Sequence, residues 1–345
     1  MAIKDYKELS DSEILVLLED NIKRSVGYYD SEISTEREKV IEYYNGNKPK
    51  APEGKSKYVS LDVYDAVESM KAALLETFSA GNQICKFAPQ GPEDVEKAEV
   101  CTTYTDFVAF RQNDLMKVMN SVIHDGLTSR VGIAKVYWDT RYDKEEQEFT
   151  DLTRDQLDML IAQDDVEAVV AEEDDFGMNS GTLVYRVDRS QVAVEPIAPE
   201  EFLIESQAKS LNFDEINFCS QRSIKTITEL REMGFDEELI DNIGDHEEID
   251  HEANPEILAR HEGAGASRGF ETGGYQDQVR RVMVYEAYMN LDKYGEGVAS
   301  LYRILKAGNT ILSCESSSTN FKNCSPPASN LIESVSKMIF VLILP

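Results

Sequence analysis

The period of the hydrophobic pattern changes near residue 130. Before this point, apolar residues recur every three or four positions, which is the spacing of amphipathic helices. One such stripe lies in SDSEILVLLEDNI and another in VYDAVESMKAALLETFSAG, and their members are Ile14, Leu17, Leu18 and Ile22, and Val63, Val67, Met70, Leu74 and Phe78. Asp11 or Ser12 can cap the first helix, and Asp62 can cap the later one. We therefore expect residues 1–130 to be mainly helical.

After this point the chain alternates between two faces. In VGIAKVYWD, Ile133 and Lys135 fall on one face, and Ala134 and Val136 fall on the other. Alternation of this kind is typical of β-strands. We expect residues 131–315 to be strand-rich, with acidic and Gly-rich loops. Helices followed by strands, without a βαβ alternation, predict an α+β fold in which N-terminal amphipathic helices pack on a strand-rich region.

Residues 316–345 differ from the sequence before them. They hold three charged residues, Lys322, Glu333 and Lys337, and they close on MIFVLILP. An exposed apolar run of this kind invites strand pairing and aggregation, so a soluble terminus seldom carries one. We expect this tail to be foreign to the fold and to be read in a shifted frame. The alternative is a real C-terminal segment that packs on the body or on a partner.

The chain is strongly acidic, and this limits its partners. Its 345 residues include 65 Asp and Glu against 35 Lys and Arg, which gives a formal charge of −30. Such a surface repels a phosphate backbone, so tight groove binding to nucleic acid is disfavoured, while DNA could still pass it without sticking. Five cysteines without a CxxC pair indicate reduced thiols. We expect neither a signal peptide nor a transmembrane segment.

The motifs that could carry chemistry each have a simpler interpretation. HEEIDHE holds His246, Glu247, His251 and Glu252, but its two histidines are five positions apart, whereas a zincin helix needs a spacing of four. A solvated acidic loop is the favoured interpretation. GAGASRG, residues 263–269, has its third glycine one position too late for a dinucleotide loop and is interpreted as a flexible linker. We expect residues 245–278 as a whole to be a mobile, dispensable loop.

The remaining motifs of the sequence do not indicate a catalytic site. The sequence has no G-x-x-x-x-G-K-[ST] loop to cradle phosphates. His124-Asp125-Gly126 lies near the end of a predicted amphipathic helix with no nucleophile assigned to it, so packing or capping is the favoured role. We therefore predict no catalytic, cofactor-binding or metal-binding residues and no enzymatic activity, including ATP hydrolysis and DNA cleavage.

Several stretches together resemble one protein family. They are RSVGYYDSEISTEREKVIEYYNG, SKYVSLDVYDAVESMKAALLETFSAG, HDGLTSRVGIAKVYWD, VAVEPIAPEEFLIES and KTITELREMGFD. In this order and spacing they resemble the N-terminal half of the portal proteins of short-tailed, P22-like bacteriophages and prophages, from about residue 10 to about residue 315.

The resemblance implies a structural subunit of a ring, usually of twelve copies, at one capsid vertex. Its expected partners are itself, the terminase large subunit, capsid and scaffolding proteins, tail and head-completion proteins, and double-stranded DNA passing through the channel without sequence-specific binding. The expected location is the portal vertex of the virion, and the host cytoplasm during assembly.

The resemblance further implies that residues 1–130 and 131–315 are two segments of a portal wing. Stem, clip and crown are absent from such a fragment, so we expect a truncated chain that does not form a stable closed ring alone. A second interpretation is an acidic adaptor or DNA-mimic protein that binds a basic partner through residues 150–178 and 245–262.

The tail hypothesis makes a prediction about the gene. If residues 316–345 come from a shifted frame, then translating the downstream DNA in the other two frames should recover acidic sequence that resembles portal stem and clip. The nucleotide sequence around codon 315 decides this. If both frames lack such sequence, a simple frameshift is wrong and the tail belongs to a short protein.

Overall fold

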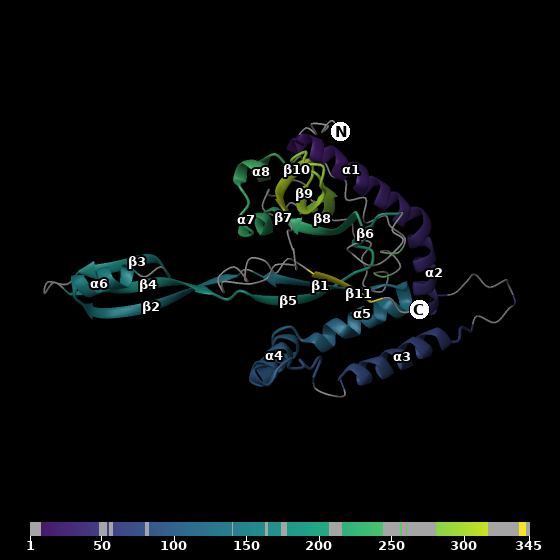
Figure 1. Ribbon diagram of the computed structural model, residues 1–345, viewed down its shortest axis with the longest axis horizontal. Coiled ribbons are helices and arrows are strands. Elements are labelled where there is room, and N and C mark those ends of the chain that lie inside the picture. The colour runs from purple at the N-terminus through teal and green to yellow at the C-terminus, as the bar shows by residue number, and fades with distance from the viewer. Residues whose placement is uncertain are drawn as a thin grey trace.

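The computed structural model describes residues 8–47, 54, 58–79, 83–139, 141–162, 165–173, 178–206, 216–243, 256, 260, 281–316 and 338–342. Helices come first and antiparallel sheets follow, so the predicted α+β class is confirmed (Figure 1). The last helix before the sheets ends at Ser129 and the first strand begins at Gly132. Arg130, between them, adopts a φ of 62°, and there the chain turns from helix to strand.

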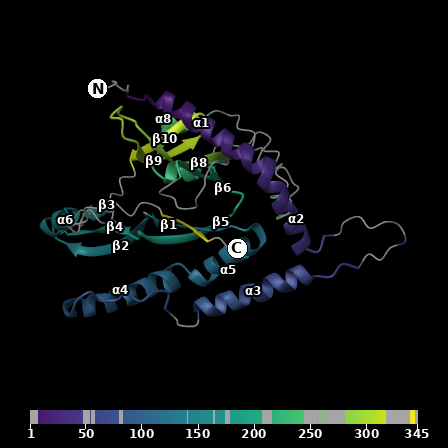
Figure 2. The ribbon, with the colours of Figure 1, turned by 45° about the vertical axis from the view of Figure 1, so that its right-hand side comes forward.

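The first two helices form one bent rod (Figure 2). Helix α1, Asp11–Tyr28, begins with a capping box in which Ser10 and Glu13 bond to each other's backbone N–H groups. The cap is thus Ser10, and the prediction of Asp11 or Ser12 was wrong because it overlooked this reciprocal pair. A π-turn, Tyr29–Ile33, joins α1 to α2, Ser34–Tyr44. In this turn the N–H of Ser34 donates to the carbonyl of Tyr29, five residues back.

Three further helices form a layer at one side of the molecule. They are α3, Asp62–Ser79; α4, Val95–Phe107, which follows a 3₁₀ turn at Pro92–Asp94; and α5, Leu115–Ser129, which follows a π-turn at Val108–Gln112. The stretch ICKFAP, residues 84–89, has no regular secondary structure. Backbone N–H groups of Ile84 and Phe87 donate instead to Asp106 and Thr102 of α4, at 3.0 and 3.1 Å. Side chains of α4 thus supply acceptors that a neighbouring strand would otherwise offer.

The five-stranded sheet carries the main core. It has the order β10-β9-β8-β7-β6 and is antiparallel throughout, with β6 Phe202–Ile204, β7 Phe218–Thr226, β8 Arg281–Leu291, β9 Ser300–Ala307 and β10 Thr310–Ser316. Helix α1 covers one face, where its buried Ile14, Leu18 and Ile22 pack against the strands. The two short helices α7, Ile227–Glu232, and α8, Glu237–Asp241, pack against alternate residues such as Val282 and Val284. Residues of β8 thus contribute to the core on both faces of the sheet.

A second sheet has the order β11-β1-β5, with β1 Gly132–Asp139, β5 Gln191–Ile197 and β11 Met338–Leu342. Ile133 and Ile197 pack against Phe202, Cys219 and Tyr288 of the five-stranded sheet. Strand β11 pairs with β1 in register Gly132 to Leu342. Five residues of the tail that we expected outside the fold therefore lie along this sheet, and the shifted-frame origin of residues 316–345 stays a prediction.

A third sheet forms a projecting arm. Its order is β2-β4-β3, with β2 Tyr142–Leu152, β3 Val166–Glu173 and β4 Asn179–Asp188, and it includes α6, Arg154–Ile161. We call these four elements the arm. Figure 1 shows it extending to the left, away from the other two sheets. Its core cluster is small, with Phe149, Leu157 and Leu183 buried. The arm therefore continues outward from the antiparallel pair β1 and β5 and has little core of its own.

The predicted stripe of α3 exists but is not covered. Val63, Met70 and Phe78 are 41%, 56% and 53% exposed, and no residue of α3 is buried within the described part of the chain. Another side of α3 meets the other helices: Glu68 accepts from the Tyr44 hydroxyl at 2.8 Å, and Tyr64 lies 5.1 Å from Tyr44 between ring centroids. These contacts attach α3 to α2, and α3 also packs along α5, while Val63, Met70 and Phe78 stay exposed.

The packing of α1 gives a stability prediction with an internal control. Leu18 is fully buried under the five-stranded sheet, whereas its neighbour Leu17 is 42% exposed. Leu18→Ala should lower the free energy of unfolding by about 3 kcal/mol, because it leaves a cavity in the core. Leu17→Ala should cost less than about 1 kcal/mol. Urea unfolding of both variants measures the difference, and equal losses would show that α1 does not pack as described.

Candidate functional site

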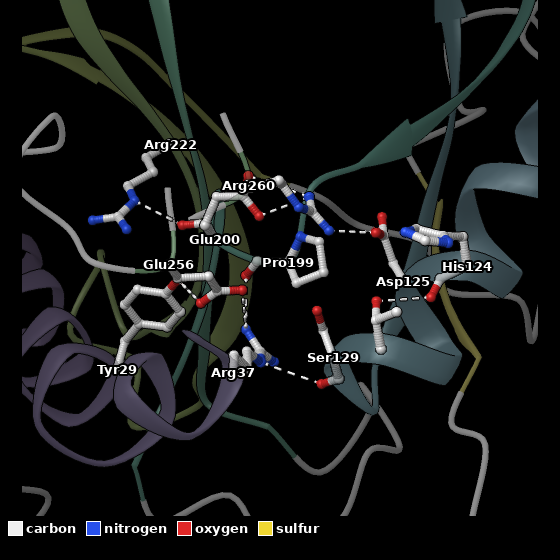
Figure 3. A network of polar contacts seen from close by, with 11 residues as sticks. Tyr29, Arg37, His124, Asp125, Ser129, Pro199, Glu200, Arg222, Glu256 and Arg260 are labelled. Atoms are coloured by element: carbon white, nitrogen blue, oxygen red, sulfur yellow. Dashed lines mark hydrogen bonds and ion pairs between the residues drawn. The ribbon is translucent and has the colours of Figure 1, made fainter. Parts of the chain in front are cut away.

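The largest group of buried charges lies where the bent rod meets α5 and the five-stranded sheet (Figure 3). It brings together Tyr29 and Arg37 from the rod, Asp125 from α5, Glu200 from the turn after β5, Arg222 from β7, and the helical residues Glu256 and Arg260. Tyr29, Asp125, Glu200, Arg222 and Glu256 are all less than a tenth exposed. We call this group the buried ion network.

Arg260 joins α5 to the turn after β5. Its Nη1 donates to both carboxylate oxygens of Glu200, at 3.2 and 2.9 Å, and its Nη2 donates to Oδ1 of Asp125. The planar guanidinium suits such contacts, because its five N–H donors lie in a fixed fork. One cation thus holds two carboxylates that would otherwise repel each other.

Arg37 and Glu256 connect the rod to the same region. Arg37 donates to the backbone carbonyls of Ser129 and Pro199, at 3.2 and 3.4 Å, and its Nη1 lies 3.8 Å from Oε1 of Glu256. The Tyr29 hydroxyl donates to Oε2 of Glu256. These contacts attach the second half of the bent rod to the end of α5.

Arg222 completes the network from the side of the sheet. Its Nε donates to the carbonyl of Glu200 at 2.9 Å, and its backbone N–H donates to the carbonyl of Glu201 at 2.8 Å. Its guanidinium carbon lies 5.2 Å from the centre of the Tyr29 ring, within the range of a cation–π contact. The turn after β5 is therefore held to β7 by backbone and side chain together.

Burial dominates the protonation of the carboxylates. It raises the pKa of Asp125 from 3.8 to about 6, and the attraction of Arg260 offsets part of that rise. Burial also raises the pKa of Glu256, which Arg37 and the Tyr29 hydroxyl oppose. For Arg260, burial lowers the pKa, but Asp125 and Glu200 outweigh it and the net shift is upward. Arg260 therefore stays protonated, whereas Asp125 and Glu256 take up a proton at a higher pH than exposed carboxylates would.

A second buried group of charges joins the five-stranded sheet to the sheet β11-β1-β5. We call these two sheets the body. Glu286 on β8 accepts from Lys135 on β1 at 2.6 Å, from Arg303 on β9 at 2.7 Å and from the Tyr288 hydroxyl at 2.9 Å. Lys135 also donates to Gln221 at 2.7 Å. Sequence alternation placed Lys135 on the same face of β1 as the buried Ile133. A lysine can be buried between the two sheets here because its ammonium group contacts the Glu286 carboxylate.

The predicted site residues have mixed outcomes. Asp125 belongs to the ion network, whereas His124 packs edge-on against Tyr44, 5.1 Å between ring centroids. The motif HEEIDHE and residues 263–269 lie outside the described residues. Within the part of the chain that the structure describes, no three His, Cys, Asp or Glu side chains gather as they would around a metal ion.

Glu256 and Arg260 correct one prediction. Both fall within residues 245–278, which we expected to be a mobile, dispensable loop, yet Glu256 is fully buried and Arg260 is largely buried with two carboxylate partners. The prediction is wrong at these two positions, and the other residues of this range lie outside the described ones. Glu256 and Arg260 are both helical and lie four positions apart in sequence.

The arrangement is suited to holding elements together rather than to reacting. Each carboxylate described in the ion network contacts an arginine, and the contacts fix the rod, α5 and β7 relative to one another. A cavity of about 310 Å³ lies beside it, lined by Tyr28, Arg37, Ser129 and Arg130 among others. The described helices include none with the length and apolar character needed to cross a membrane.

Comparison with known proteins identifies the class. Residues 14–327 match the model of a family of phage portal proteins, which are structural components. The chain belongs to this family, described as the phage SU10 portal protein family. Among curated proteins, none matches the chain. The match extends beyond Glu315, where the resemblance noted in the sequence ended, and the P22-like type stays a prediction.

The raised pKa of Asp125 predicts a pH dependence. Because the folded pKa of about 6 exceeds the ordinary value of 3.8, this group contributes stability at low pH that is lost as pH rises through about 6. Between about pH 4.5 and about pH 7.5, the wild type should lose roughly 2 kcal/mol relative to Asp125→Asn. Urea unfolding of both proteins at the two pH values measures this difference.

The matched control is Asp20→Asn, which removes one negative charge from an exposed position on α1. It reports the general effect of net charge on a chain this acidic. A difference of the same size in this control would show that burial of Asp125 is not the cause. A difference of opposite sign in Asp125→Asn would show that Arg260 outweighs burial.

Proposed function

We propose that this chain contributes to the portal ring of a phage, the channel at one capsid vertex through which the genome is packaged and ejected. Membership of the portal family over residues 14–327 carries the proposal. Portal family members form an oligomeric ring associated with the capsid. In this proposal the ring docks the terminase large subunit and later the tail and head-completion proteins, after assembly with capsid and scaffolding proteins in the host cytoplasm.

The charge distribution supports the part of the proposal that concerns DNA. The chain has a formal charge of −30, and the buried arginines of the ion network are engaged by carboxylates. Because Asp and Glu outnumber Lys and Arg by 65 to 35, the chain as a whole repels phosphates, and a wall of this kind lets a duplex move past without sticking. This agrees with a channel component that does not bind DNA in a sequence-specific way.

The fold supports assignment to the wing of a portal subunit. The bent rod, the helical layer and the two sheets of the body are joined by two buried ion groups, which gives a stiff unit from which the arm projects. In this proposal residues 1–130 and 131–315 are two segments of one wing. The subunit is located at the portal vertex of the virion.

A second function rests on the arm. Its four elements hold eleven Asp and Glu against three Lys and Arg. A surface with this much negative charge could engage a basic protein in place of DNA, which would make the chain an acidic adaptor or DNA mimic. Residues 150–178, which the sequence suggested for this role, largely belong to the arm. Residues 245–262 lie outside the described residues except at Glu256 and Arg260.

The two functions predict different distributions of the protein in infected cells. A tagged copy expressed in cells that produce the phage should copurify with capsids and mark one vertex per particle when labelled for electron microscopy. A chain that stays out of particles and displaces DNA from a basic protein in a competition assay would overturn the portal proposal and support the mimic. An untagged copy serves as the labelling control.

A further inference from the structure

The outward side of α3 has the composition of a contact surface. We call Val63, Val67, Met70, Leu74 and Phe78 the α3 stripe. Together with the preceding Tyr58 and Leu61, which are 85% and 48% exposed, it presents seven large apolar side chains in a row. Aromatic residues and methionine are enriched at the centres of protein interfaces, where charged residues are depleted.

The size of this surface lies at the upper end of what a monomer normally exposes. Five of these side chains are 41% to 85% exposed and Val67 and Leu74 are partly buried, so together they offer on the order of 500 Å² of surface, against the roughly 800 Å² that one partner contributes to a stable complex. Patches of this size on soluble proteins usually mark a binding site. The stripe therefore has the dimensions of one half of an interface.

The arm also exposes large apolar side chains. Met159 and Val170 are 75% and 67% exposed, and Ile161 is 44% exposed. Because the arm buries a small core of its own, these side chains gain most from burial against something else. Figures 1 and 2 place the arm at one end of the molecule and the start of α3 toward the other end. The described contacts do not join the arm to α3 within one copy.

We propose that the arm of one copy docks on the α3 stripe of a second copy. The inference rests on the proposed function, because it names the contact between neighbouring subunits. A contact between two different surfaces leaves each copy with one free arm and one free stripe, so it can continue from copy to copy, and it closes into a ring if the rotation allows. A contact between two identical surfaces would stop at a pair.

Charge favours this pairing over a contact between two arms. The arm has an excess of eight carboxylates, so two arms repel each other. The chain immediately before Tyr58 is its most basic stretch, NKPKAPEGKSK, with four lysines. Residues 47–79 as a whole hold five lysines against five Asp and Glu, so the accepting segment is neutral and repels the arm less than a second arm would.

A complementation experiment tests the proposal on the full chain. Met70→Glu spoils the stripe and leaves the arm intact, whereas Met159→Glu spoils the arm and leaves the stripe intact; both positions are exposed, so both variants should fold. Each variant alone should have a Kd for self-association at least about tenfold weaker than the wild type. An equimolar mixture should form pairs, because one intact arm meets one intact stripe, and it should form no longer species.

The matched control is Val298→Glu, which adds the same charge at a position 69% exposed between β8 and β9. It should associate like the wild type in sedimentation velocity or mass photometry. If the mixture of the two variants stays monomeric, or if Met159→Glu associates normally, the arm is not the partner of the stripe and the proposal is wrong.

The result can be separated from the proposed function. A wild type that remains monomeric at high concentration but still enters capsids would overturn this contact and leave the portal role standing. A chain that associates through arm and stripe but never enters capsids would uphold the contact and overturn the portal role.

Discussion

Arg260 brings a positive charge into a largely buried position, and the carboxylates of Asp125 and Glu200 hold it there. A charge removed from water must be paired where it lies, and breaking such a pair costs more than the pair contributes to stability over an apolar alternative. The contribution of this group is to geometry. Both carboxylates contact Arg260 in only one relative position of α5 and the turn after β5. Glu286, with Lys135 and Arg303, imposes the same condition between the two sheets.

Local pattern predicted most of the fold and little of the site. Helical periodicity located α1, α3 and α5, and alternation located β1, because these patterns depend on neighbours in sequence. The partners of Arg260 lie 60 and 135 residues away. Short-range reasoning interpreted its segment as solvated because polar residues are normally exposed. The α3 stripe shows the opposite case. Its apolar pattern predicted buried side chains, but several of them are exposed in the single chain, because the pattern does not specify what covers a helix face.

The buried charges of the described residues have one use in common. Carboxylates, arginines and a lysine that would suit catalysis in another setting are engaged here in holding layers together. A structural family fits this use of charge. Inside the protein, buried cations and carboxylates pair with each other, and the excess of Asp and Glu over Lys and Arg gives the chain its net negative charge.

The π-turn at Tyr29–Ile33 has a consequence for how this chain can vary. Each residue of an α-helix turns the next by about 100°, so the extra residue of a π-turn sets the phase of α2 relative to α1. With that phase, α1 presents Leu18 to the sheet while α2 presents Arg37 to the carbonyls of Ser129 and Pro199. Loss of a single residue from this turn would rotate the whole of α2 away from those acceptors. Among related chains, substitutions in the rod should be common, whereas changes of length between Tyr29 and Ser34 should be rare.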